Sequence, residues 1–153
     1  MKKFLIPFLF LISTFTLSAQ AFMTPITLRV DINQLDGVGT NIHINVSSNV
    51  MSWSSTPMDD SDGDGIYEKT IYVGSSAGQQ TEFLYAFQLQ STMGMLINMQ
   101  WEGSGDSECL YDGSNDGYGG FGKVRKLLVP SQIPSNFIVS TCWNECTSTC
   151  EPD

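Results

Sequence analysis

Apolar and polar residues alternate along most of the chain. Between Pro25 and Asn33, one face carries four aliphatic side chains and the other face carries polar ones; the aliphatic residues are Ile26, Leu28, Val30 and Ile32. A period of two is the pattern of a β-strand with one face buried. This segment therefore predicts a half-buried strand.

Six further segments have strand character, and turns rich in Gly, Pro and Asp separate them. They are residues 41–47, 66–73, 82–90, 93–101, 123–129 and 136–143. Within 82–90 the apolar face is aromatic and consists of Phe83, Tyr85, Phe87 and Leu89. No segment has a helical period. Seven short strands predict an all-β fold, an antiparallel β-sandwich, with a long polar loop at 102–122.

An acidic loop before the strand at 66–73 is the most distinctive stretch. Three carboxylates at alternate positions, with Glu68 as the nearest further ligand, have the spacing of a calcium loop: Asp60, Asp62 and Asp64. Position twelve of such a loop is Ile71 here, where helix-flanked calcium loops carry glutamate. The alternative is a plain hairpin turn with solvated carboxylates. A calcium ion bound here would have a structural role and no catalytic one.

The first 21 residues have the layout of a secretory signal peptide. Two lysines precede an apolar run, and small residues follow it at Ser18, Ala19 and Ala21. The run is short for a membrane span, and cleavage could follow Ala19 or Ala21. We therefore expect a product that is secreted, periplasmic or on the cell surface, without membrane insertion. Residues 22–143 would form the sandwich and 144–153 a polar tail.

The excess of acidic residues limits the classes of molecule that this protein is expected to bind. Seven basic residues stand against sixteen acidic ones, for a net charge of −9, and loss of Lys2 and Lys3 with the signal peptide changes it to −11. Such a surface repels nucleic acid and anionic lipid. We expect no nucleic-acid partner, and a neutral polysaccharide or a protein instead.

Four cysteines remain after the signal peptide: Cys109, Cys142, Cys146 and Cys150. In an exported chain such cysteines form disulfides more often than zinc sites. Three pairings are possible. We expect Cys109–Cys142 and Cys146–Cys150, which leaves no free thiol.

Little in the sequence indicates an enzyme. The only histidine, His43, falls on the polar face of the strand at 41–47. The sixteen carboxylates include no pair marked out for glycoside hydrolysis. The glycine-rich run at 118–122 lacks the strand-to-helix switch of a nucleotide loop. We expect a non-catalytic protein with no cofactor, apart from a structural calcium ion if the acidic loop binds one.

The order of motifs resembles that of a known kind of module. I-T-L-R-V-D-I at 26–32 is followed by Trp53, T-P-M at 56–58, D-S-D-G-D-G at 60–65, Y-E at 67–68, an aromatic strand at 83–87 and Trp101. Cys109, Arg125 and C-W-N-E-C-T-S-T-C at 142–150 complete the pattern. The sequence thus resembles secreted Bacteroidetes-type immunoglobulin-like β-sandwich modules, which are related to the starch- and glycogen-binding modules of amylases and branching enzymes.

The resemblance implies a secreted, non-catalytic carbohydrate-binding module for a neutral polysaccharide such as a starch- or glycogen-like glucan. In the starch-binding relatives, two aromatic platforms and a lysine hold the sugar. By position, the platforms are Trp53 and Trp101, while the lysine position holds Ala86. Both tryptophans could instead pack in the core. The alternative function is a protein-interaction or surface-assembly sandwich, which the absent lysine favours.

Overall fold

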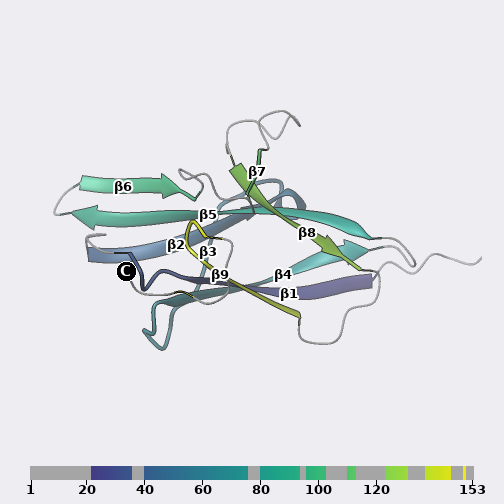
Figure 1. Ribbon diagram of the computed structural model, residues 1–153, viewed down its shortest axis with the longest axis horizontal. Helices are drawn as coiled ribbons and strands as arrows, with labels where there is room; N and C mark the ends of the chain where they lie inside the picture. Colours follow the sequence, from purple (N-terminus) through teal and green to yellow (C-terminus); the bar gives the residue numbers. More distant parts are fainter. Residues whose placement is uncertain are drawn as a thin grey trace, which may run out of the picture.

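Two β-sheets lie face to face in the computed structural model (Figure 1). The structure describes residues 22–35, 40–75, 80–93, 96–102, 110–112, 123–130, 137–145 and 150. The predicted signal peptide lies outside these residues, as do Cys109 and Cys146. Across the described ranges, no helix is both long and apolar enough to span a membrane.

The smaller sheet has three strands in the order β4-β1-β9. They are β1 (Phe22–Asp31), β4 (Ile66–Ser75) and β9 (Phe137–Cys142). β1 pairs with β4 in antiparallel register, with Ile26 opposite Ile71, and with β9 in parallel register, with Ile26 opposite Phe137. The expectation of a purely antiparallel sandwich is therefore wrong for this one pair, because β9 enters the sheet beside β1 and runs in the same direction.

The larger sheet has the order β3-β2-β5-β8-β7, and β6 also pairs with β5. Its strands are β2 (Thr40–Ser48), β3 (Thr56–Pro57), β5 (Thr81–Met93), β6 (Leu96–Trp101), β7 (Leu110–Asp112) and β8 (Lys123–Val129). A short 3-10 helix, η1 (Asn49–Met51), follows β2. All pairs in this sheet are antiparallel. All seven predicted strands are present, and the all-β class is confirmed.

Two strands were not predicted, β3 and β7. β3 has two residues and β7 has three, which is too short for an alternating pattern to show in the sequence. β7 lies inside 102–122, a stretch expected to be one long loop.

The core lies between the two sheets and follows the predicted alternation. Its buried members include the four aliphatic residues of the first predicted strand and the inner face of β5, namely Phe83, Tyr85, Phe87 and Leu89. The rings along β5 contact one another: the Phe83 and Tyr85 centroids are 5.2 Å apart and stacked, and the Tyr85 and Phe87 centroids are 5.5 Å apart, edge to face. Trp143, just after β9, is also buried in this core.

The disulfide pairing differs from the prediction. Cys142 is bonded to Cys150, with their Cα atoms 5.5 Å apart. Both predicted bridges are wrong, because each would use one of these two cysteines. Cys142 ends β9, the chain turns at once through Trp143 and Asn144, and Cys150 lies beside the end of the strand.

Candidate functional site

The two predicted platform residues meet on one surface of the molecule. Leu84 and Ala86 alternate with the core residues of β5, so they point to the outer face of the larger sheet. There they form a small buried cluster with Val124 of β8, and Trp53 and Trp101 pack against it as partly buried side chains. We call this surface, made of Trp53, Trp101, Leu84, Ala86 and Val124, the tryptophan face. The two tryptophans are neither in the main core nor fully exposed.

Different elements supply the two rings. Trp101 ends β6 and lies opposite Gln88 of β5, two residues from Ala86. Trp53 follows η1 in the connection between β2 and β3. Sequence reasoning named both residues, and the structure brings them to the same cluster.

The backbone at Trp53 is unusual. Ser52 and Trp53 both have left-handed conformations, with φ of 52° and 60°. A bulky residue in this region is an outlier that costs about 1–3 kcal/mol, and such strain concentrates at functional sites. The Trp53 N–H donates to the Ser48 carbonyl at 2.8 Å, which holds the turn. The turn therefore keeps the Trp53 ring over the sheet at a cost in backbone energy.

Ser47 supplies a polar group at the base of the tryptophan face. It lies directly opposite Ala86 in the β2–β5 register, so both side chains share the outer face. Ser47 is 1% exposed, and its Oγ has no hydrogen-bond partner in the described structure. Buried hydroxyls without partners are rare. The cluster thus combines flat aromatic surface with an unpaired hydroxyl.

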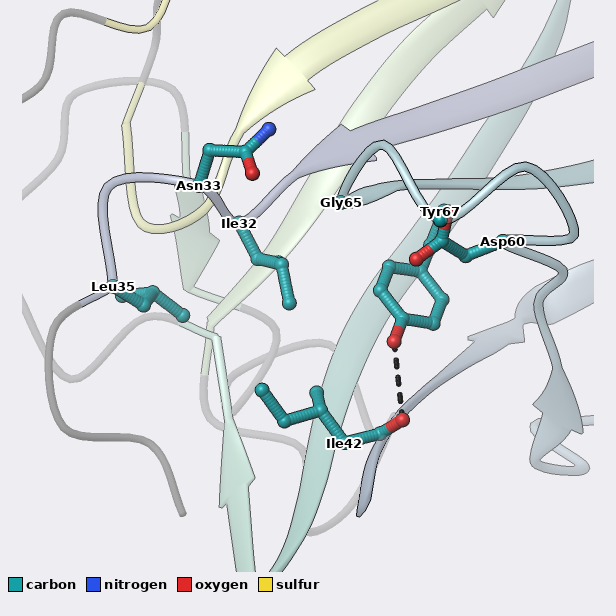
Figure 2. Close-up of a pocket in the computed structure, with 8 residues that line it drawn as sticks. Ile32, Asn33, Leu35, Ile42, Asp60, Gly65 and Tyr67 are labelled. Carbon is teal, nitrogen blue, oxygen red and sulfur yellow. Dashed lines mark hydrogen bonds between the residues drawn. The ribbon is translucent and has the colours of Figure 1, made fainter. Parts of the chain in front are cut away.

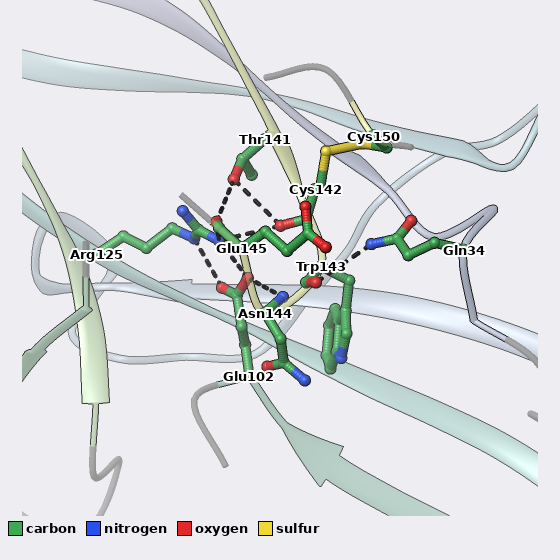
Figure 3. Close-up of polar contacts among 9 residues, drawn as sticks. All are labelled: Gln34, Glu102, Arg125, Thr141, Cys142, Trp143, Asn144, Glu145 and Cys150. Atoms are coloured by element: carbon green, nitrogen blue, oxygen red, sulfur yellow. Dashed lines mark hydrogen bonds and ion pairs between the residues drawn. A yellow bond between two sulfur atoms is a disulfide. The ribbon is translucent and has the colours of Figure 1, made fainter. Parts of the chain in front are cut away.

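A buried ion pair lies behind the tryptophan face, and no sequence pattern indicated it. Glu102 and Arg125 are 2% and 6% exposed. Arg125 Nε donates to Glu102 Oε2 at 2.8 Å, and Nη2 contacts Glu102 Oε1 (Figure 3). The two-pronged geometry is the strong form of this interaction. Glu102 begins the stretch that was expected to be a long polar loop, so nothing in its sequence surroundings marked it as buried.

The turn after β9 completes the polar network (Figure 3). Arg125 Nη2 donates to the carbonyls of Cys142, at 3.2 Å, and Glu145, at 2.7 Å. The Asn144 N–H donates to Glu102 Oε1 at 3.0 Å. Asn144 itself has a φ of 59°, a conformation that Asn tolerates better than most residues. The network therefore links the larger sheet to the turn that follows the smaller sheet.

Tyr85 lies in the core beside this network, directly opposite Arg125 in the β5–β8 register. Burial raises the pKa of Tyr85 to about 12; the Arg125 charge lowers it and the Glu102 charge raises it. Tyr85 is therefore neutral at physiological pH, and its ring packs in the main core.

The acidic loop brings three of the four predicted calcium ligands together. One carboxylate oxygen from each of Asp60, Asp62 and Asp64 lies within 4.8 Å of the others. Asp60 Oδ1 is buried without a hydrogen-bond partner in the described structure, whereas Asp64 Oδ1 accepts the Ile66 N–H at 2.8 Å. Glu68 is outside this group, because its carboxylate forms an ion pair with Arg29. Three converging carboxylates suit a hard cation, and further ligands would come from backbone carbonyls or water.

The loop is fastened to the end of β1. The Ile32 N–H donates to the Gly65 carbonyl at 3.1 Å, and Asn33 Nδ2 donates to the Asp64 carbonyl at 2.8 Å. Gly65 has a φ of 79°, and a Cβ there would lie 2.3 Å from Asn33 Oδ1. Only glycine fits this position, which explains the second glycine of D-S-D-G-D-G.

A pocket of about 290 Å³ lies between this loop and the β1–β2 connection; its lining includes Ile32, Asn33, Leu35, Ile42, Asp60 and Tyr67 (Figure 2). The Tyr67 hydroxyl donates to the Ile42 carbonyl at 3.0 Å. Burial raises the pKa of Tyr67, and the nearby Asp60 charge raises it further. The hydroxyl is therefore neutral at physiological pH and acts as a structural donor.

Chelation tests the calcium prediction. A cation bound only by the native state would stabilise it by about 2.7 kcal/mol at a concentration roughly 100 times its Kd. We expect the melting temperature to fall when EDTA replaces excess calcium, and expect no such difference in a variant combining Asp60→Asn and Asp62→Asn. The measurement is thermal unfolding followed by circular dichroism. Identical melting curves with and without calcium would contradict the calcium prediction and support the alternative, a plain hairpin turn with solvated carboxylates.

One serine motif gives no support to an enzyme. Residues 74–78 read G-S-S-A-G, which fits the letters G-x-S-x-G of a nucleophile elbow. That motif needs a strand-to-helix turn in an α/β sheet. Here the letters begin at the end of β4 and precede β5, two strands of different sheets, and the central residue, Ser76, is outside the described residues.

Comparisons with known proteins found no match to a family model, a curated protein or a solved structure. The geometry of the tryptophan face is thus the principal evidence on function.

Proposed function

We propose that this chain is a secreted, non-catalytic carbohydrate-binding module that binds a neutral polysaccharide of the starch or glycogen type. The observation that carries the proposal is the meeting of Trp53 and Trp101 on one outer cluster, each partly buried. Sugar rings present flat C–H surfaces, and aromatic side chains supply the flat apolar partners for them.

The charge and the resemblance described from the sequence support the same ligand class. The acidic chain suits a neutral polymer better than an anionic one. Ala86 occupies the centre of the cluster where the resembled modules place a lysine, so binding here relies on stacking more than on a charged donor.

Truncation of each ring tests the proposal. Trp53→Ala and Trp101→Ala should each weaken binding to glycogen or amylopectin by about 30-fold, since losing an aromatic anchor typically costs about 2 kcal/mol. Each should lose less stability than the roughly 3–5 kcal/mol of a fully buried tryptophan. Affinity electrophoresis and chemical denaturation on the same variants measure both quantities. Absence of wild-type binding to a panel of neutral polysaccharides would contradict the proposal.

A second candidate, a protein-interaction module, is favoured by the outer face of the smaller sheet. Three large apolar side chains there are at least half exposed: Met23 at 62%, Tyr72 at 60% and Ile138 at 50%. Tyr72 lies opposite Pro25, and Ile138 opposite Thr27, in adjacent register positions. Tyr72→Ala distinguishes the candidates, because it should leave glycan binding at the tryptophan face unchanged and weaken a protein contact on the other sheet.

A further inference from the structure

β6 and β8 share one edge of β5. β8 pairs with Thr81–Tyr85 and β6 pairs with Gln88–Met93, while β2 occupies the opposite edge. The end of β6 therefore meets the start of β8 beside Ala86 and Phe87. At this junction the Glu102 N–H donates to the Phe87 carbonyl at 3.0 Å. The side chains of Glu102 and Arg125 then join the two strands.

The tryptophan face and the ion pair are the two sides of this junction. Trp101 precedes Glu102 and Val124 precedes Arg125, and successive side chains on extended backbone point to opposite faces. Trp101 and Val124 thus point outward to the cluster, while Glu102 and Arg125 point inward to the turn after β9. A shift of the ion pair moves the backbone that carries Trp101.

The support of the ion pair comes from outside the larger sheet. Its polar contacts include the carbonyls of Cys142 and Glu145 and the Asn144 N–H. The Cys142–Cys150 disulfide closes this turn. By contrast, Trp53 lies in the connection between β2 and β3, where its backbone N–H donates to the Ser48 carbonyl. The two rings pack against one cluster but are carried by different backbone segments.

We infer that Glu102 and Arg125 are positioning residues of the tryptophan face, which set the place of the Trp101 ring relative to Trp53 and thereby the affinity for polysaccharide. The affinity part rests on the proposed function. Two rings stack on one glycan only when their spacing matches the sugar units, so a binding site needs its contact residues locked by packing and hydrogen bonds behind them.

Arg125→Lys is the informative variant. Lysine keeps the charge that balances Glu102, but it cannot reproduce the fork that holds the carboxylate and two carbonyls together. Removing a supporting contact behind a binding residue often costs 10–100-fold in metal sites, and we expect about tenfold weaker glycogen binding here. The matched control is Arg29→Lys, in an exposed ion pair with Glu68 on the other sheet, which should bind as the wild type does.

Fluorine NMR of protein labelled with 5-fluorotryptophan supplies a readout that does not depend on a ligand. The sequence has three tryptophans, and single Trp→Phe variants assign their resonances. We expect Arg125→Lys and Glu102→Gln to shift or broaden the Trp101 resonance and leave the Trp53 resonance in place. Arg29→Lys should change neither. If one variant fails to fold, the other supplies the measurement.

The outcomes separate the two proposals. A folded Arg125→Lys protein with unchanged Trp101 resonance and unchanged affinity would overturn the positioning role while leaving the glycan proposal intact. Equal changes at Trp53 and Trp101 would also overturn it, since they indicate general loosening. A wild type that binds no polysaccharide would overturn the proposed function, and the fluorine spectra would still decide whether the ion pair places Trp101.

Discussion

Glu102→Ala is expected to lower the free energy of unfolding by about 3–5 kcal/mol, the usual effect of leaving one partner of a buried ion pair uncompensated. Arg125 would remain charged in a site that is 6% exposed, and the carbonyls of Cys142 and Glu145 that it contacts carry no charge to balance it. The Asn144 N–H would also lose its acceptor. Urea denaturation of wild type and variant gives the difference directly.

Glu82→Ala is the matched control for that loss. Glu82 forms an ion pair with Lys126, but the two side chains are 43% and 37% exposed. Exposed pairs contribute about 0–1 kcal/mol, so this variant should unfold almost as the wild type does. A combined Glu102→Leu and Arg125→Met protein should recover part of the loss, because neither charge is then buried alone. A change below 1 kcal/mol for Glu102→Ala would show that the pair is not buried in solution.

Trp143→Ala is expected to cost about 3–5 kcal/mol of stability, the range for removing a large aromatic from a core. Trp143 is 2% exposed and belongs to the main core cluster. Its backbone N–H donates to the Asp31 carbonyl at 3.0 Å, and its backbone carbonyl accepts from Gln34 Nε2 at 3.2 Å. Alanine keeps both backbone bonds, so the loss of stability reports the packing of the indole ring in the core.

Trp53→Ala is the comparison for Trp143→Ala, since the same atoms are removed from a partly buried position outside the main core. Chemical denaturation of both variants under one set of conditions should rank Trp143→Ala as clearly the more destabilising. Equal losses would mean that Trp53 is a core residue, and its role as a glycan platform would then be untenable.

The strands could be predicted because their pattern is local. Ile26, Leu28 and Val30 all face the core as their alternation indicates, and so does the aromatic face of β5. In the middle of β5, the alternation did not show that the residues on the outer face are buried too. Leu84 and Ala86 are buried as well, because Trp53 and Trp101 cover the outer face.

The candidate sites were predicted unevenly. Alternate carboxylates in one loop are local, so the convergence of Asp60, Asp62 and Asp64 followed from their spacing. Glu68 is also close in sequence, yet its partner is Arg29 of the neighbouring strand. The Glu102–Arg125 pair was not foreseen: Arg125 was named only as part of the resembled pattern, Glu102 belongs to no motif, and the two are 23 positions apart.

By itself, the sequence determined the all-β class, the seven main strands, the inward residues of the most regular strands, such as β1 and β5, and the acidic turn. Each follows from side-chain period or turn chemistry within about ten residues. The tertiary structure alone decided the parallel β1–β9 pair, the Cys142–Cys150 bond, the buried ion pair and the meeting of Trp53 with Trp101. These depend on which strands become neighbours and in which register, and a two-residue period is the same for every such arrangement.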